Sequence, residues 1–318
     1  MTKSTRALAV GVAIAAIGVT AVRAEAGAPG PPPSSYHTLD APGAGTTWGT
    51  GQRGTFPQST NGHAIVGYVV DNNNHAQGFL DKHGSFTTIS APGAGPGPGQ
   101  GTYAVGISKN GTVVGSFTDS NGFNHAFVDR NGKYTTIDDP AGAGGGSGTI
   151  AQGVNNSGLI SGLTIDANGS YHGFVLNRGV FTAVDMPNAS TAANQGTVLA
   201  SINASGTIAG LWDDANGVTH GFLYRSGHIT LVPDAPDAGM ASGQGTSVYG
   251  VNDRGVVCGQ FVDAYGNTFG FARSPKHFTA FFDPKGVITA VGDVADNGLV
   301  VGNYIDKHGV SHGFTNHL

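Results

Sequence analysis

Short runs rich in Val, Ile, Thr, Phe and Tyr alternate with Gly-containing turns along most of this chain. One stretch of 37 residues shows the pattern clearly, with apolar runs at 102–108, 112–118, 124–129 and 134–138. Gly occupies the turns between them, where the backbone needs a positive φ. No helical period competes after residue 26. The pattern predicts four short antiparallel strands joined by hairpins.

This four-strand pattern recurs six times with a period of roughly 48 residues, so the chain is a repeat protein. A Gly marks each copy, at Gly67, Gly115, Gly162, Gly210, Gly259 and Gly302. A Phe follows in each copy, at Phe79, Phe127, Phe174, Phe222, Phe271 and Phe314. The units are 41–90, 91–138, 139–185, 186–233, 234–282 and 283–318.

The sixth unit ends before its fourth strand, and residues 36–40 match that strand, as seen at 134–138 in the second unit. An N-terminal strand that completes the last unit would remove two open sheet edges. We therefore predict one all-β domain over 36–318. It is a six-bladed β-propeller of four-stranded antiparallel blades, with the last blade closed by the N-terminal strand. An open stack needs no such exchange, and a parallel β-helix does not fit three hairpins per unit.

The N-terminus has the features of a secretory signal at residues 1–26. Lys3 and Arg6 precede an apolar run, and a small-x-small site follows at 24–26. The run is short for a membrane anchor, and no later segment could span a bilayer as a helix. We predict cleavage and a secreted or periplasmic protein, with 27–35 as a flexible leader; a retained anchor is the alternative.

The composition of the chain argues against several classes of function. The net charge is −5 and there is no basic patch, which argues against nucleic-acid binding. The single cysteine, Cys258, excludes an internal disulfide and a Cys-based metal site. Other units have Val, Ser or Ala at its position, so a buried small residue is expected there. We predict a monomer without cofactor.

Two polar series repeat with the units. An Asp begins the turn after each second strand, at Asp71, Asp119, Asp166, Asp214, Asp263 and Asp306. Such an Asp accepts backbone N–H bonds within its turn, so a structural role is favoured over a ring of metal ligands. Four units add a histidine, at His125, His172, His220 and His312. Gln77 and Phe269 replace it elsewhere, so we expect a structural imidazole bonded to a turn or a Thr of its own unit.

The units also carry a recognisable motif, Gly-x-Asn-x-x-Gly-x-Val-x-Gly followed by His-Ala/Gly-Phe. Stretches that resemble it are Gly106 to Gly115 with 125–127, Gly153 to Gly162 with 172–174, and Gly250 to Gly259. It resembles the HAF-repeat family of exported bacterial proteins, and this resemblance implies secretion and propeller-like repeats but no particular reaction. The first unit departs from the motif and contains Pro57, so pairing of its first strand is expected to be irregular.

A ligand site is expected where the loops between units meet the propeller axis. Just before the first strands, this mouth would carry Gln100, Gln195, Gln244 and Arg53, with Trp48 nearby. These side chains suit a neutral, hydroxyl-rich ligand such as a glycan. The alternative is that the amides only bond to their own loops. Asp293 faces the axis where other units have Gly or Ser, and is the best candidate for a functional acid.

The favoured function is a secreted binding protein for a glycan or a cell-envelope component. No Gly-x-Ser-x-Gly, Cys/His pair or His-Glu-x-x-His motif is present. The alternative is a glycan-active lyase or hydrolase with an axial Asp. Such an enzyme would need two Asp carboxylates, from Asp293 with Asp253 or from Asp213 beside Asp214.

Overall fold

The computed structural model describes residues 36–47, 52–142 and 148–318 of this chain. The predicted signal, the leader and Trp48 lie outside these residues. The described part is all-β, as predicted; its only helix is the short 3₁₀ turn η1 (Pro140–Gly142). Among the described residues, no helix is long and apolar enough to cross a membrane.

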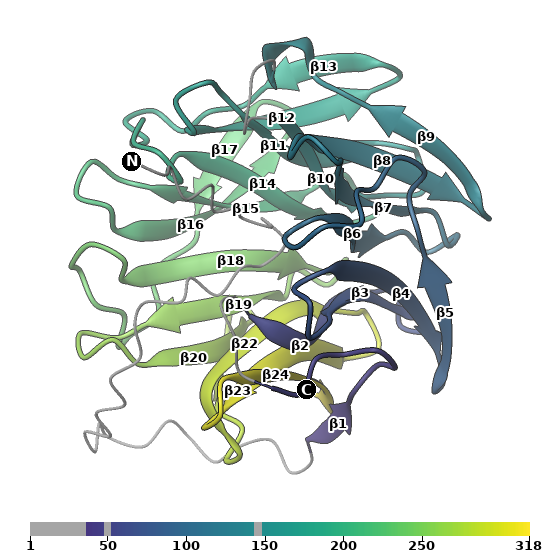
Figure 1. Ribbon diagram of the computed structural model, residues 1–318. Coiled ribbons are helices and arrows are strands. Elements are labelled where there is room, and N and C mark those ends of the chain that lie inside the picture. The colour runs from purple at the N-terminus through teal and green to yellow at the C-terminus, as the bar shows by residue number, and fades with distance from the viewer. Residues whose placement is uncertain (1–35, 48–51, 143–147) are drawn as a thin grey trace, which may run out of the picture.

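Within each unit, strands follow one another as antiparallel neighbours (Figure 1). The first strands are β2 (Arg53–Thr60), β6 (Gly101–Ile107), β10 (Gly148–Val154), β14 (Thr197–Ile202), β18 (Gly245–Val251) and β22 (Gly286–Val294). The second strands are β3 (Ile65–Val70), β7 (Val113–Thr118), β11 (Ile160–Ile165), β15 (Ile208–Asp213), β19 (Val257–Val262) and β23 (Leu299–Asp306). The third strands are β4 (Ala76–Lys82), β8 (Asn124–Arg130), β12 (Tyr171–Asn177), β16 (Thr219–Arg225), β20 (Thr268–Arg273) and β24 (Val310–His317).

The fourth strands are β5 (Ser85–Ile89), β9 (Lys133–Ile137), β13 (Val180–Ala183), β17 (His228–Leu231) and β21 (Phe278–Phe281). Figure 1 shows β5, β9 and β13 on the periphery and β6, β10 and β14 nearer the middle. The sixth unit takes its outer strand from the other end of the chain. β1 (His37–Leu39) pairs antiparallel with β24, and Thr38 lies opposite Phe314.

Neighbouring units join through their first and third strands. β4, β8, β16 and β24 each pair in parallel with the first strand of the next unit, and Tyr171 bridges Gly196 in the same way. Each first strand also contacts the first strands on either side of it, and β22 contacts β2. The backbone hydrogen bonds themselves form sheets of 16 and 8 strands, neither of which is closed.

A buried threonine near the start of each first strand holds the loop that leads into that strand. Its hydroxyl oxygen accepts the backbone N–H of the residue at or just after the end of the preceding fourth strand. The six pairs are Thr55 with Ala41, Thr102 with Ala91, Thr149 with Asp139, Thr197 with Met186, Thr246 with Ala235 and Thr289 with Asp283, at 2.8–3.0 Å. The Thr55 pair ties the chain just after β1 to β2.

The repeated Phe and Gly form the core of each unit. All six Phe side chains are buried. Glycine is required opposite them: a Cβ on Gly162 would lie 2.2 Å from the Ile150 carbonyl oxygen and 2.7 Å from Phe174 Cζ. As expected, pairing is irregular at Pro57, where the register shifts between Pro57 and Ser59, yet β2 pairs with β3 from Gly54 to Thr60. Pro57 lies at the β-bulge present in every first strand, where a proline is tolerated.

Candidate functional site

The loop face, formed by the Asp turns and the loops between units, carries the predicted amides just before the first strands. Their oxygens are occupied within their own loops. Gln100 Oε1 accepts the Gly97 N–H at 2.9 Å, and Gln244 Oε1 accepts the Ala241 N–H at 3.0 Å. Gln195 Oε1 accepts the Ser190 hydroxyl at 2.6 Å. These bonds show that the amides support their own loops, which was the alternative role. Ligand binding by the same amides stays a prediction.

Arg53, at the start of β2, also serves its loop. Its Nη1 donates to the carbonyl and hydroxyl oxygens of Thr47 at 3.2 and 3.3 Å. Trp48, the aromatic partner expected beside it, lies outside the described residues.

The six repeated Asp residues hold the turns of the loop face. In the second unit Asp119 Oδ1 accepts the N–H groups of Asn121 and Phe123 at 2.8 and 2.9 Å. Asp71, Asp166, Asp214, Asp263 and Asp306 repeat this geometry. The bond from the Ser170 N–H holds the pKa of Asp166 below its usual value.

Each repeated histidine lies between two carboxylates. His125 Nδ1 is 3.0 Å from an Asp138 oxygen, and its Nε2 is 3.7 Å from Asp119. His172, His220 and His312 repeat this with Asp185 and Asp166, Asp234 and Asp214, and Asp40 and Asp306. The partners are therefore carboxylates rather than a Thr hydroxyl. The hydrogen bond to Asp185 raises the pKa of His172.

The units without this histidine change its partner as well. Gln77 donates to Ser90 Oγ at 2.9 Å, where other units have Asp. Phe269 packs against Phe282, with ring centroids 5.8 Å apart. In one unit a polar side chain faces a polar partner, and in the other an aromatic ring faces an aromatic ring. This is the behaviour of a packing contact. Within the described residues, no three His, Cys, Asp or Glu side chains are arranged to hold a metal ion.

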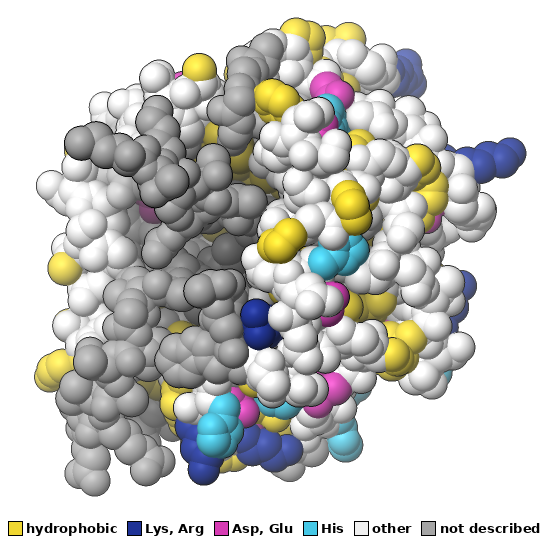
Figure 2. Space-filling model, in the orientation of Figure 1, with side chains coloured by type: hydrophobic (Ala, Val, Ile, Leu, Met, Phe, Trp, Pro, Cys, Tyr) yellow, Lys and Arg dark blue, Asp and Glu magenta, His cyan; other side chains and the backbone are white. Residues whose placement is uncertain are grey.

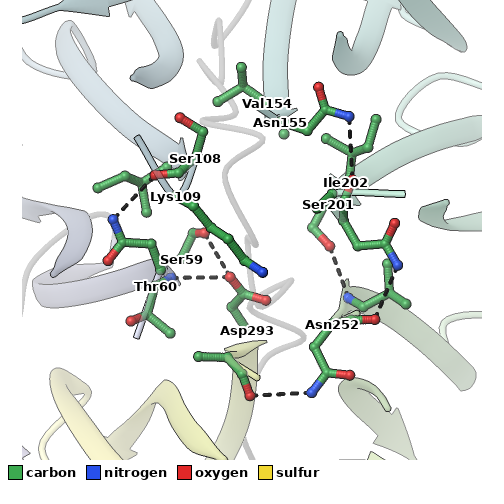
Figure 3. A pocket seen from close by; sticks show the side chains of 18 of the residues that line it. Ser59, Thr60, Ser108, Lys109, Val154, Asn155, Ser201, Ile202, Asn252 and Asp293 are labelled. Carbon is green, nitrogen blue, oxygen red and sulfur yellow. Dashed lines mark hydrogen bonds between the residues drawn. The ribbon is translucent and has the colours of Figure 1, made fainter. Parts of the chain in front are cut away.

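The opposite, turn face is where each first strand turns into the second, and a pocket of about 80 Å³ opens there on the axis (Figure 3). All six units contribute to its lining. The first strands converge closely at this level: a Cβ on Gly106 would lie 2.5 Å from the Gln152 carbonyl oxygen. The sixth unit places Asp293 at the position of Gly106, and Asp293 lines the pocket.

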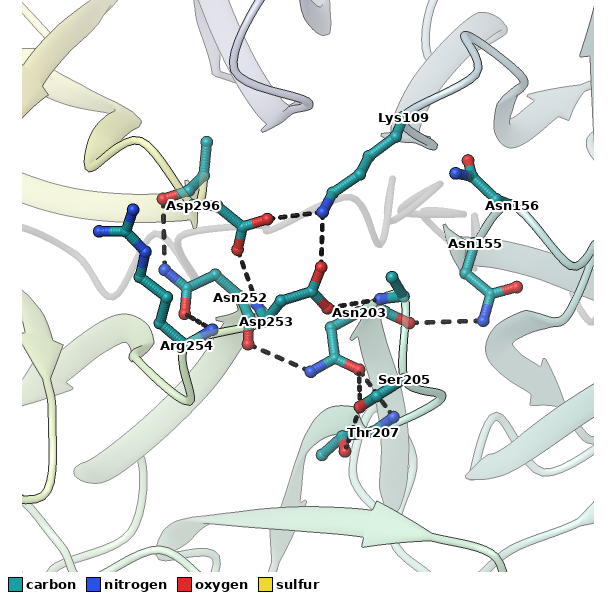
Figure 4. Close-up of polar contacts among 12 residues, drawn as sticks. Lys109, Asn155, Asn156, Asn203, Ser205, Thr207, Asn252, Asp253, Arg254 and Asp296 are labelled. Atoms are coloured by element: carbon teal, nitrogen blue, oxygen red, sulfur yellow. Dashed lines mark hydrogen bonds and ion pairs between the residues drawn. The ribbon is translucent and has the colours of Figure 1, made fainter.

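A ring of side-chain amides surrounds this pocket (Figures 3 and 4). Each amide bridges two neighbouring units through a backbone group. Asn61, Asn155, Asn203, Asn252 and Asn297 donate to carbonyls of the next unit, and Asn156 accepts the Asn110 N–H, all at 3.0–3.4 Å. Sequence reasoning missed this ring, although three of its members, Asn155, Asn203 and Asn252, are the Asn of the Gly-x-Asn-x-x-Gly motif or its equivalent.

Charged side chains from three units meet at the mouth of the pocket. Lys109 Nζ lies 2.5 Å from Asp253 Oδ2 and 2.6 Å from Asp296 Oδ2 (Figure 4). All three residues are partly exposed. The hydrogen bond to Asp253 raises the pKa of Lys109. The sequence suggested Asp253 with Asp293 as a carboxylate pair, and both line this pocket; Lys109 and Asp296 carried no repeat signal.

Asp293 is a nearly buried carboxylate that links the last unit to the first. Its Oδ2 accepts the Ser59 hydroxyl at 2.7 Å and the Thr60 N–H at 3.1 Å. Burial raises the pKa of Asp293 despite these bonds. Asp213, the other suggested acid, accepts the Thr219 hydroxyl at 2.7 Å and also has a pKa raised by burial. It does not line the axial pocket.

We expect Asp293→Asn to gain stability relative to wild type as the pH rises from 4 to 8, because it removes a carboxylate whose charged form is disfavoured by burial. The raised pKa means that the folded state keeps a proton that the unfolded state has lost. Stability from this group is therefore present below the unfolded pKa and is lost as the pH rises through the folded pKa. Urea unfolding from pH 4 to 8 measures the difference between the two proteins, which should widen with pH. Asp237→Asn, at an exposed site, is the control; equal curves for D293N and wild type would contradict the prediction.

No protein-family model and no curated protein sequence matches the chain. Among solved structures, the fucose-specific lectin from Aleuria aurantia is similar over 88% of this chain and 93% of the lectin, with TM-score 0.52 and 15% identity. The SapL1 lectin in complex with alpha methyl fucoside matches over 74% of this chain and 83% of that one, with TM-score 0.47 and 14% identity. The β-propeller domain of the Trilobed protease from Pyrococcus furiosus covers 82% and 93%, at TM-score 0.45 and 9% identity.

The similarity to the Aleuria lectin concerns the fold, since the identity is low. This chain therefore has the fold of the β-propeller lectins.

Proposed function

We propose that this protein is an exported, six-bladed β-propeller that binds a glycan, either free or as part of the cell envelope. Six four-stranded meanders, contacts between β22 and β2, and the pairing of β1 with β24 support a ring closed by the N-terminal strand. The HAF-like motif and the signal-like residues 1–26 favour export.

One observation carries the binding function: the chain follows the fold of a fucose-specific lectin over 88% of its length. The surface agrees with a neutral ligand. Only 11% of the residues are charged, and in Figure 2 apolar side chains lie singly or in small groups on the visible face. The amides and Arg53 of the loop face stay candidates for the ligand contacts.

The test is a retention screen of the purified protein on immobilised neutral, uronate and sulfated polysaccharides and on fucose-terminated oligosaccharides. We expect retention on at least one neutral glycan, competed by that glycan in solution. The variant with Gln100, Gln195 and Gln244 changed to Ala tests the loop-face amides, and equal retention would remove them from the site. A protein that is retained on none of these glycans would refute the binding function.

A glycan-active lyase or hydrolase is the second candidate, because Asp293 shares its pocket with Lys109, Asp253 and Asp296. A carboxyl group with a raised pKa suits a general acid. The same polysaccharides are assayed for chain shortening. Depolymerisation that D293N abolishes would support this enzyme, and its absence on all substrates would favour a pure binding protein.

A further inference from the structure

A second, larger hollow lies where the last unit meets the first. This seam groove has a volume of about 400 Å³ and is lined by residues at β1 and β24, at the turn after β2, and at β3, β4 and β5. Its lining includes Thr38, Asp40, His63, Asp81, His83 and Phe86. The volume falls within the range of about 300–1,000 Å³ typical of small-molecule sites, unlike the axial pocket.

The groove opens at this junction for two structural reasons. The turn after β2 is one residue shorter than its equivalents: Asn61 N donates to the Ala64 carbonyl, whereas Ser108 N donates to that of Thr112. The outer strand of the sixth unit, β1, has only three residues. Both features leave fewer residues at the junction of the last unit and the first, so a hollow remains there.

Aromatic and hydrogen-bonding groups alternate along the groove. Phe86 is half-buried and packs edge to face on Phe79, with centroids 5.6 Å apart. Asp81 is nearly buried, and its Oδ1 accepts the Gly84 N–H at 2.7 Å. The His63 and His83 side chains are exposed on the lining. A flat apolar ring beside carboxylate, hydroxyl and imidazole groups matches the apolar C–H face and the hydroxyl edge of a sugar.

The charged residues on the lining determine which class of sugar the groove can bind. No Lys or Arg belongs to the lining, whereas Asp40 and Asp81 do. At the edge of the groove, Lys285 donates to Thr38 Oγ1 at 3.3 Å, and Lys82 follows Asp81 in the chain. The fixed charges on the lining are carboxylates, of which Asp40 lies beside His312 and Asp81 accepts the Gly84 N–H, so the groove disfavours uronate and sulfate groups. We infer that the seam groove binds a neutral sugar ring of the glycan, which rests on the proposed function.

The repeat itself supplies variants that should fold. His83 sits at φ 54°, as Asn131 does at 55° in the second unit, so His83→Asn keeps a side chain that this turn already accepts. Ile229 occupies the position of Phe86 in the fourth unit, so Phe86→Ile retains an apolar side chain but removes the aromatic ring. The third unit has Arg178 and Phe181 at these two positions, away from the groove, for matched substitutions.

The experiment compares wild type, H83N/F86I and the control R178N/F181I on glycan arrays that carry neutral oligosaccharides and their uronate and sulfated counterparts. We expect wild type and R178N/F181I to bind a neutral glycan equally. H83N/F86I should bind it about tenfold more weakly, a loss in line with an aromatic contact of about 1.4 kcal/mol. Urea unfolding checks that the variants are folded.

Each other outcome counts against a particular claim. Unchanged neutral-glycan binding by H83N/F86I would overturn the groove and leave the proposed function standing. Equal binding of uronate or sulfated glycans by wild type would overturn the inferred ligand class. Wild type that binds no glycan would overturn both the groove and the proposed function.

Discussion

Replacing Phe174 with Ala lowers the free energy of unfolding by about 3–5 kcal/mol, the cost of removing a fully buried aromatic ring. Phe174 is 1% exposed, and its ring lies against the space that Gly162 leaves free. The truncation leaves a cavity. The Ile150 carbonyl and the strands around it do not move to fill this cavity, because hydrogen bonds between the strands hold them in place. Urea unfolding followed by tryptophan fluorescence measures the loss.

The control for this substitution is Val180→Ala in the same unit. Val180 is 65% exposed, so its truncation should change stability by no more than about 0.5 kcal/mol. A loss below about 1 kcal/mol for Phe174→Ala would mean that the repeated Phe is not the centre of its unit.

Deleting residues 1–40 should destabilise the protein by about 4 kcal/mol and promote aggregation. The deletion removes the ladder between β1 and β24, whose backbone hydrogen bonds contribute roughly 2 kcal/mol together. It also removes Tyr36, whose ring packs edge to face on Phe314 at 5.1 Å, with burial contributing about 2 kcal/mol. The freed edge of β24 can then pair with another molecule.

The matched control is deletion of residues 1–35 alone, which keeps Tyr36 and β1. Melting temperature and light scattering are compared for the two deletions. If both remain equally stable and monomeric, the N-terminal strand is not needed to complete the sixth unit.

Several features of the fold were readable in the sequence because they depend on short-range chemistry. The turn glycines and the alternating apolar runs predict the strands, and the missing fourth strand after Phe314 predicts a partner near Tyr36. Pro57 marks an irregularity in its strand but not a break in the pairing. Here it coincides with a bulge that all six first strands share.

The candidate sites were harder to predict. The amide of Gln100 could turn toward the axis or toward its loop, and only the loop conformation decides that it accepts the Gly97 N–H. Lys109 is 144 residues from Asp253 and 187 from Asp296, and nothing in the repeat links them. Their meeting depends on how three units are arranged around the axis.

The sequence by itself determined the repeat, its strands and its turns. These follow from local backbone preferences and from contacts within one unit. The tertiary structure alone decided the axial charge cluster and the seam groove, since both form between units. Their geometry depends on strand lengths, loop lengths and the junction of the two chain ends, which no single unit encodes.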